Sequence, residues 1–258
     1  MNIRHIIRIA SITFEENYRK KFLYILLFLS GIIVISSYFF DPFEIGRQFP
    51  VIADVSLTAL STLGVIMTFG LFLTAIPNEI EKKTIYPLMS KPINRSDYLW
   101  GKYLGNMLMI FINLFVLGTL LFFLLRRMNE AFAFGTLINS VILTFIECGI
   151  LGAIIVLFSP WMSYPVNLVL SLLFYLTGNL SSGYIQYLAA DPRTAFSAGL
   201  VLLLKMFLPS FEFLQIKNSI VHSYIVDPNY IRGAVIYGVI YIFIIMLLAD
   251  LLFQRKDL

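Results

Sequence analysis

The chain has 258 residues, of which 59% are hydrophobic and 13% are charged, and its mean hydropathy is +0.85. A soluble domain carries about 25% charged and about 45–50% apolar residues, so this composition excludes a water-soluble globule and indicates an integral membrane protein. The formal net charge of +4 does not by itself indicate nucleic-acid binding, and we expect no nucleic-acid partner. The single cysteine, Cys148, lies in an apolar run, which excludes a disulfide framework and a cysteine metal cluster.

Long apolar stretches predict an all-α polytopic membrane protein with six transmembrane helices. About 20 residues are needed to cross about 30 Å of hydrocarbon, and six stretches are long enough: 22–40, 55–76, 101–125, 136–158, 166–186 and 234–253. We expect one transmembrane domain over 1–258, in which residues 1–21 form a cytoplasmic interfacial helix. Its other parts are 22–186 (spans one to five, with a coupling segment at 77–98), an extracytoplasmic segment at 187–233, and 234–258 (span six and cytoplasmic tail).

The extracytoplasmic segment 187–233 is predicted to contain short broken helices. Its apolar patch 195–208 is too short to cross a membrane and is interrupted by Lys205. Prolines punctuate the segment at positions 192, 209 and 228. We hypothesise that these broken helices lie on the outer membrane surface and gate an exit.

Lysine and arginine placement predicts that both termini are cytoplasmic. With six spans, the termini share a side with the 77–100 and 159–165 loops. That side holds twelve of the Lys and Arg residues and the other side holds seven. Cytoplasmic loops carry the excess of positive charge, although the Arg126–Arg127 pair opposes this bias.

The first 21 residues predict a basic amphipathic helix that lies in the membrane interface. Its apolar face consists of Ile3, Ile6, Ile7, Ala10, Phe14 and Tyr18, and its polar face of Arg4, Arg8, Ser11, Glu15 and Arg19. Two interpretations stay open. The helix is a membrane anchor alone, or it also borders a partner protein.

A charged, proline-punctuated segment lies between the second and third apolar runs. Asn78 and Glu81 form a variant of the capping box at the start of a short helix, and Pro87 stops or kinks that helix. Charges mixed with Tyr, Leu and Met suit docking into a partner's groove, where a few apolar anchors supply most of the affinity. The alternative is an ordinary positively charged cytoplasmic loop with a capped helix.

The stretch NEIEKKTIYPLMSKPINRSDYLWGKYLG, residues 78–105, resembles the cytoplasmic loop of ABC-2-type transporter permeases. The residues that carry the resemblance are Glu79, Glu81, Lys83, Thr84, Lys91, Pro92, Arg95, Gly101 and Lys102. More narrowly, the chain resembles the permease component for multi-copper enzyme maturation, a likeness that includes FEENYRKKFLYILLF, IGRQFPVIADVSLTALSTLGV and LLFQRKDL. Pro87 departs from the family pattern, in which a helix former is expected.

The resemblance implies the permease subunit of an ATP-binding-cassette transporter, an exporter of an unidentified substrate in the cytoplasmic (inner) membrane. Such permeases pair with a second copy or a paralogue and dock on a separate ABC-type ATPase, which binds the ATP and Mg, so no cofactor is expected in this chain. The implied ATPase-coupling residues are Glu79, Glu81, Lys82, Lys83, Thr84, Ile85, Tyr86, Leu88, Lys91 and Arg95. The implied interfacial-helix residues are Arg4, Arg8, Phe14, Tyr18 and Arg19. The alternative function is a membrane scaffold or assembly factor that recruits cytoplasmic partners without transport.

The sequence holds no motif for catalysis. Gly101 and Lys102 are followed by Tyr103, and Ser96 stands where the first glycine of a phosphate-binding loop would be. The two histidines, His5 and His222, are too far apart in the predicted topology to form a zinc site. We therefore expect a non-catalytic subunit with no catalytic, cofactor-binding or metal-binding residues.

Glu147 is the candidate pathway residue, because it falls near the middle of the fourth predicted span. An ionisable group at that depth costs several kcal/mol unless it faces a cavity or a partner. The alternative is a protonated glutamic acid that bonds a neighbouring helix, for instance at Asn113 or Ser171.

Overall fold

The computed structural model describes residues 3–21, 24, 28, 31–32, 48–77, 79, 94–128, 134–189, 209–216 and 227–255. Within these residues the fold is all helical, with six α-helices, one short 3-10 helix and no strand, which confirms the predicted class. The elements are α1 (Ile3–Tyr18), α3 (Gln48–Ala75), α6 (Arg95–Met128), α7 (Phe134–Phe158), α8 (Tyr164–Ala189), η3 (Phe211–Leu214) and α11 (Pro228–Gln254).

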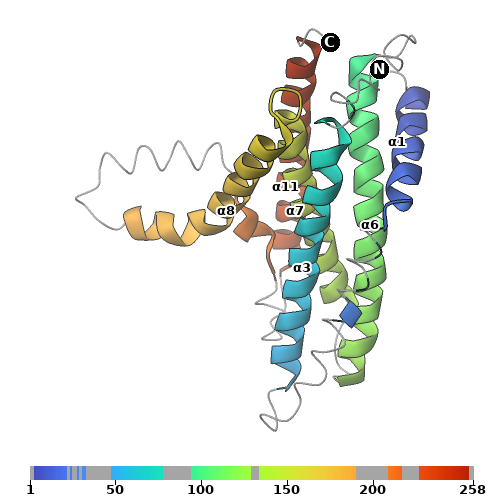
Figure 1. The fold of residues 1–258 in the computed structure, drawn as a ribbon. Helices are drawn as coiled ribbons and strands as arrows, with labels where there is room; N and C mark the ends of the chain where they lie inside the picture. Colours follow the sequence, from blue (N-terminus) through green and yellow to red (C-terminus); the bar gives the residue numbers. More distant parts are fainter. Residues whose placement is uncertain are drawn as a thin grey trace.

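The long helices α3, α6, α7 and α11 run side by side as a bundle (Figure 1). Helix α1 lies along one end of α6, and α8 diverges from the bundle so that its C-terminal part points away from it (Figure 1). The starts of α1 and α6 and the ends of α3 and α11 lie at the same end of the bundle, at the top of Figure 1.

Four of the described helices are long and apolar enough to cross a membrane: Ile52–Ala75, Arg95–Arg126, Leu137–Phe158 and Pro228–Gln254. They correspond to the second, third, fourth and sixth predicted spans. Helix α8 covers the fifth predicted span, 166–186, but is not one of these four. Most of the first predicted span, 22–40, lies outside the described residues.

Helix α7 is the centre of the bundle. In its most apolar stretch 72% of the residues are buried, against 22% for α11. Helix α7 packs against α3, α6, α8 and α11, so its side chains form much of the core. The outer face of α11 instead exposes large apolar side chains such as Phe243 and Leu251, which suits contact with lipid or with a second membrane subunit.

Two helix starts have clear local causes. Asp227 caps α11, because its side chain accepts a hydrogen bond of 2.9 Å from the Asn229 backbone N–H, and Pro228 follows at the first helical position. In α6 the carboxylate of Asp97 lies in the first turn. Its negative charge interacts favourably there with the positive end of the helix dipole.

The start of α6 is tied to the end of α11. Ser96 Oγ donates to Asp250 Oδ2 at 3.0 Å, and Arg95 Nη1 donates to the Gln254 carbonyl at 3.2 Å. Gln254 Nε2 donates to Ser96 Oγ at 3.0 Å. These bonds hold two chain segments together that are more than 150 residues apart in sequence.

Residues 209–216, in the middle of the predicted extracytoplasmic segment, pack into the bundle. Phe211 is fully buried, and its ring centroid lies 5.2 Å from that of Tyr175 in α8. The close approach requires glycine at position 178, because a Cβ there would lie 2.6 Å from both the Phe211 ring and the Pro209 carbonyl. Of the rest of 187–233, residues 187–189 belong to α8 and 228–233 to α11, with Asp227 as its cap, and residues 190–208 and 217–226 lie outside the described residues.

Candidate functional site

Helix α1 lies against the first turns of α6 through two glycines of α6. A Cβ at Gly101 would lie 2.7 Å from Ile9 Cβ, and a Cβ at Gly105 would lie 2.7 Å from both the Ala10 carbonyl oxygen and Thr13 Cβ. Small residues spaced four apart let two helix backbones approach closely. The Gly-x-x-x-Gly pattern therefore serves to dock α1 onto α6.

The buried stripe of α1 differs from the predicted apolar face. The residues buried against α6 are Ile6, Ile9, Thr13 and Asn17. Ile3, Ile7 and Tyr18, which belong to the predicted apolar face, are more than half exposed. Helix α1 thus has one face on α6 and an adjacent apolar face that is mostly exposed among the described residues. Its predicted location in the membrane interface stays a prediction.

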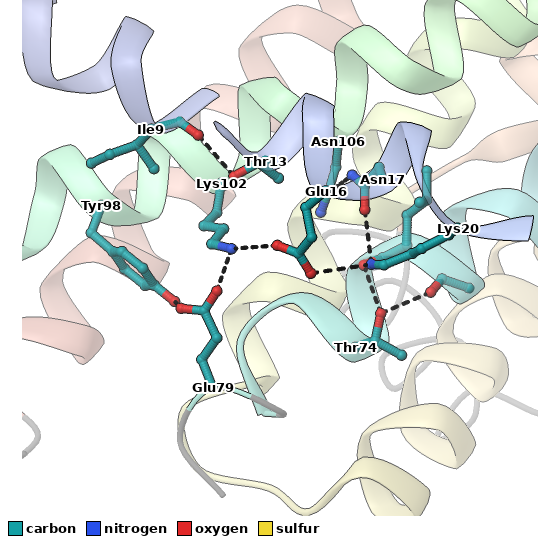
Figure 2. A network of polar contacts seen from close by, with 12 residues as sticks. Ile9, Thr13, Glu16, Asn17, Lys20, Thr74, Glu79, Tyr98, Lys102 and Asn106 are labelled. Carbon is teal, nitrogen blue, oxygen red and sulfur yellow. Dashed lines mark hydrogen bonds and ion pairs between the residues drawn. The ribbon is translucent and has the colours of Figure 1, made fainter. Parts of the chain in front are cut away.

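Four charged side chains from three parts of the chain form a cluster that we call the charge clamp: Glu16, Lys20, Glu79 and Lys102. Figure 2 shows Lys102 of α6 reaching between Glu16 of α1 and Glu79, which follows the end of α3. Lys102 Nζ lies 3.3 Å from Glu16 Oε2 and also pairs with Glu79 Oε1. Lys20 Nζ lies 3.6 Å from Glu16 Oε1. The two lysines and two carboxylates balance each other in charge.

Hydrogen bonds extend the charge clamp on both sides (Figure 2). Tyr98 Oη donates to Glu79 Oε2 at 2.6 Å. On the other side Lys20 Nζ donates to Asn17 Oδ1 at 2.8 Å, and Asn17 Nδ2 donates to Asn106 Oδ1 at 2.6 Å. A continuous polar chain therefore runs from the end of α3, across α6, to the last turn of α1.

The charge clamp is largely shielded from solvent at its centre. The Lys102 side chain is 7% exposed and that of Glu79 is 19% exposed, whereas that of Glu16 is 51% exposed. A buried ammonium group is tolerated only when it is paired and hydrogen-bonded, and Lys102 has two carboxylates for this. Burial lowers the pKa of Lys20 from its ordinary value, and the Glu16 carboxylate opposes that shift.

A second polar contact joins α1 to α6 nearer their starts. His5 Nδ1 lies 3.6 Å from Asp97 Oδ2, and the Asp97 side chain is fully buried. Within the part of the chain that the structure describes, no group of three or more His, Cys, Asp or Glu side chains could hold a metal ion.

The family model described as ABC-2 family transporter protein matches residues 43–258. This chain belongs to the ABC-2 transporter family. No curated protein matches it. The chain is thus a permease subunit of an ABC transporter and a multi-pass membrane protein. Members of this family are generally non-catalytic transport components that normally work with an ABC ATPase.

The family match covers Glu79 and Lys102 but begins after α1. The contribution of α1 to the permease therefore rests on its contacts: the docking on Gly101 and Gly105 and the ion pair between Glu16 and Lys102. Through these contacts α1 packs onto the first turns of α6, within the part of the chain that the family model matches.

Most predicted ATPase-coupling residues lie outside the described part of the permease. These are Glu81, Lys82, Lys83, Thr84, Ile85, Tyr86, Leu88 and Lys91. The two that are described stand at the edges of that segment: Glu79 in the charge clamp and Arg95 on the Gln254 carbonyl. Both edges of the segment are therefore fixed to other helices.

The predicted interfacial-helix residues do not take part in the charge clamp. Arg4 and Arg8 are exposed on α1, and Arg19 is exposed just after its end. Phe14 is half-buried and its ring centroid lies 6.3 Å from that of Tyr18. Their predicted roles at the membrane and at the ATPase remain predictions.

Glu147 is almost fully buried, at 1% exposure, near the middle of α7. Tyr175 Oη of α8 donates to Glu147 Oε1 at 3.1 Å, and Gln215 Nε2 lies 3.5 Å from the same oxygen. The two partners named from the sequence each donate to a carbonyl of their own helix, Asn113 to Met109 and Ser171 to Asn167. The pathway role of Glu147 stays a prediction.

Sequence reasoning missed the residues that complete the charge clamp. Glu16, Asn17 and Lys20 fall on the polar side of the α1 pattern, and Tyr98 and Asn106 fall in the polar start and the apolar run of α6. One signal was present: Lys102 lies just inside an apolar run. Charged side chains inside a span commonly pair with one another or with backbone carbonyls, and the sequence alone does not identify the partner.

Proposed function

We propose that this permease exports its substrate across the cytoplasmic (inner) membrane, as a dimer with a second copy or a paralogue, and that a separate ABC ATPase drives it through the segment between α3 and α6. ATP and Mg bind that partner and not this chain. The narrower resemblance, to permeases involved in multi-copper enzyme maturation, belongs to this proposal, and it rests on sequence motifs alone. The substrate is left open.

The observation that carries the coupling proposal is the charge clamp. Glu79 stands at the start of the proposed ATPase-docking segment, and Lys102 joins it to α6 and to Glu16 of α1. A displacement of the docking segment would move Glu79. Through Lys102 this movement would reach α6, and through Glu16 it would reach α1. Paired charges with little exposure give such a connection a defined geometry.

The proposed topology has six spans with both termini in the cytoplasm. The contacts at the start of α6 support it, because Ser96 and Arg95 bind Asp250 and Gln254 at the end of α11. The last turn of α11, the end of α3 and the start of α6 are therefore on the same side of the bundle (Figure 1). The excess of lysine and arginine assigns that side to the cytoplasm.

The test is ATP hydrolysis by the permease co-purified with its cognate ATPase. We expect Glu16→Gln and Glu79→Gln to preserve the complex and to lower permease-dependent hydrolysis several-fold, because each removes one carboxylate from Lys102. Glu15→Gln is the matched control. It removes the same charge from an exposed neighbour on the same helix, and we expect no change.

A double substitution in the docking segment, Glu81→Ala with Tyr86→Ala, tests the docking itself. Loss of the complex in this variant, together with loss of stimulation in the clamp variants, would support the proposal. A chain that forms no complex with any ATPase, or one whose variants all stimulate hydrolysis like the unaltered protein, would favour the scaffold alternative.

A further inference from the structure

A polar cavity lies between helices α3, α7 and α8 and residues 214–216, and none of its described lining residues belongs to the charge clamp. Its volume is about 230 Å³, enough for one small organic molecule or about seven waters at ~30 Å³ each. Five of its described lining residues carry an aliphatic hydroxyl group. We call them the hydroxyl wall: Thr58, Ser61 and Thr62 on α3, and Ser140 and Thr144 on α7.

Other threonine hydroxyls in the long helices bond to the backbone of their own helix. Thr68 Oγ1 in α3 donates to the Gly64 carbonyl at 2.8 Å, and Thr177 Oγ1 in α8 donates to the Leu173 carbonyl at 2.7 Å. Such a bond to the carbonyl four residues earlier satisfies a hydroxyl locally. Within the described part of the chain, by contrast, no hydroxyl of the hydroxyl wall bonds to protein. These hydroxyls are therefore available to the contents of the cavity.

The two hydroxyls on α7 make polar contents necessary. Ser140 and Thr144 lie one turn apart, and each residue is only 7% exposed. A hydroxyl that is withdrawn from water without a hydrogen-bond partner is destabilising. Because both residues line the cavity, ordered water or a ligand with several hydrogen-bonding groups removes this cost.

The other polar groups of the lining are bonded to one another. Tyr175 Oη donates to Glu147 Oε1 at 3.1 Å, and Gln215 Nε2 lies 3.5 Å from the same oxygen. Gln215 Nε2 also donates to Asn179 Oδ1 at 2.7 Å. These contacts engage the Glu147 carboxyl group within the chain and hold the polar groups in place. Binding through the hydroxyl wall therefore does not require a charged ligand.

The cavity is reached from the exposed face of α3. Thr58 and Thr62 lie one turn apart, line the cavity and are exposed, and Ser61 is half-buried between them. Polar side chains within a span mostly face the interior of the bundle or a water-filled cavity. The two exposed threonines therefore give a polar solute a route from this face to Ser140 and Thr144.

We propose that this cavity binds a small neutral polyol, a ligand with several hydroxyl groups on a short carbon chain, through the hydroxyl wall. This inference rests on the proposed function, because it names the class of substrate that the permease would carry. A hydroxyl group both donates and accepts hydrogen bonds, so the hydroxyl wall and a polyol match each other in both senses. A polyol such as erythritol has about as many non-hydrogen atoms as the waters that would fill the cavity.

The test compares erythritol, butanetriol, butanediol and butanol, which share a four-carbon chain and differ in their number of hydroxyl groups. Binding is measured by saturation-transfer NMR titrations on the full chain in phosphatidylcholine nanodiscs, without the ATPase. Empty nanodiscs give the background from partition into lipid. We expect the affinity to rise with each added hydroxyl group, by at least about tenfold from butanol to erythritol, because each one adds a hydrogen bond. Partition into an apolar space gives the opposite order.

Substitutions then locate the site. Thr144→Val keeps the shape of the side chain and removes its hydroxyl, so we expect erythritol to bind about threefold more weakly, the loss of one hydrogen bond. Adding Thr62→Val should bring the loss to about tenfold, whereas butanol should bind as before. Thr177→Val is the matched control, because it removes an exposed hydroxyl outside the cavity that its own helix already bonds. It should bind erythritol like the unaltered protein.

Equal affinity across the series, tighter binding of butanol than of erythritol, no binding of erythritol below about 10 mM, or equal losses in Thr144→Val and Thr177→Val would overturn the inference. A cavity that holds only water would give the third of these results. The failure is distinguishable from failure of the proposed function, because ATPase coupling is read from the clamp variants and from hydrolysis, and neither enters this experiment.

Discussion

The charge clamp and the polar cavity around Glu147, which residues of α3, α7, α8 and 214–216 line, are both polar regions inside an apolar bundle, but their polar side chains are arranged differently. In the charge clamp two lysines face two carboxylates from three parts of the chain. In the cavity a single carboxyl group, Glu147, is surrounded by hydroxyls and amides of the described lining. Removing one partner of a shielded ion pair leaves an uncompensated charge and is strongly destabilising. Removing the charge of a carboxyl group whose hydrogen bonds a glutamine can keep costs less.

The largest loss of stability is expected from a substitution of Lys102, the central cation of the charge clamp. We expect Lys102→Met to lower the free energy of unfolding by about 3 kcal/mol, because it leaves the shielded Glu79 carboxylate without its cation. Denaturation of the purified chain in mixed micelles measures the loss. The double variant Lys102→Met/Glu79→Gln should recover part of it, and losses that simply add would contradict a direct interaction.

The docking of α1 is tested at Gly105. Gly105→Ala places a Cβ 2.7 Å from a backbone oxygen of α1, which cannot move away without shifting the helix, so we expect a loss of about 2 kcal/mol. Gly233→Ala in α11 is the matched control. A Cβ there meets nothing within 4 Å, and a helical alanine should be neutral or slightly stabilising. Melting temperatures that fall equally in both variants would contradict the close packing of α1 on α6.

A substitution of Tyr98 tests one hydrogen bond of the charge clamp. Tyr98→Phe removes only the hydroxyl that donates to Glu79 at 2.6 Å, and a hydrogen bond to a charged group contributes about 1.5 kcal/mol. We expect a melting temperature lower than that of the unaltered protein and a partial loss of ATPase stimulation. Tyr164→Phe, at an exposed tyrosine of α8, is the control. An equal effect of the two changes would mean that the Tyr98 hydroxyl does not stabilise the charge clamp.

The smallest effect on stability is expected in the cavity. Glu147→Gln keeps an oxygen for the Tyr175 hydroxyl, so the free energy of unfolding should change by less than about 1 kcal/mol. The same denaturation assay measures it. A large loss, like that expected for Lys102→Met, would mean that Glu147 stabilises the bundle and would erase the difference between the two regions.

The sequence predicted the helices that lie in hydrocarbon better than their extensions beyond it. Spans 136–158 and 234–253 fall within α7 and α11, and span 55–76 ends one residue past α3, because apolarity over about 20 residues marks all three. Helix α6 begins at Arg95, before the apolar run 101–125 that marks the predicted span. Its first turns are polar, and hydropathy does not detect a helix that continues outside the membrane.

The charge clamp could not be predicted from periodicity. Glu16 and Lys102 are 86 residues apart, and Asn17 and Asn106 are 89 apart, and no local pattern encodes which polar side chains will meet. Glu147 was found because an ionisable group inside a span is unusual. Its neighbours Tyr175 and Gln215 depend on how α8 and 209–216 pack on α7, which only the three-dimensional arrangement gives.

The 34-residue length of α6 has a mechanical consequence. At ~1.5 Å per residue the helix is about 50 Å long, well beyond the thickness of the hydrocarbon, and no proline interrupts it between Arg95 and Met128. It is therefore a stiff lever whose short arm carries Lys102 and whose long arm reaches the opposite side. A tilt of about 10° imposed at the short arm would move the far end by about 6 Å, roughly one helical turn.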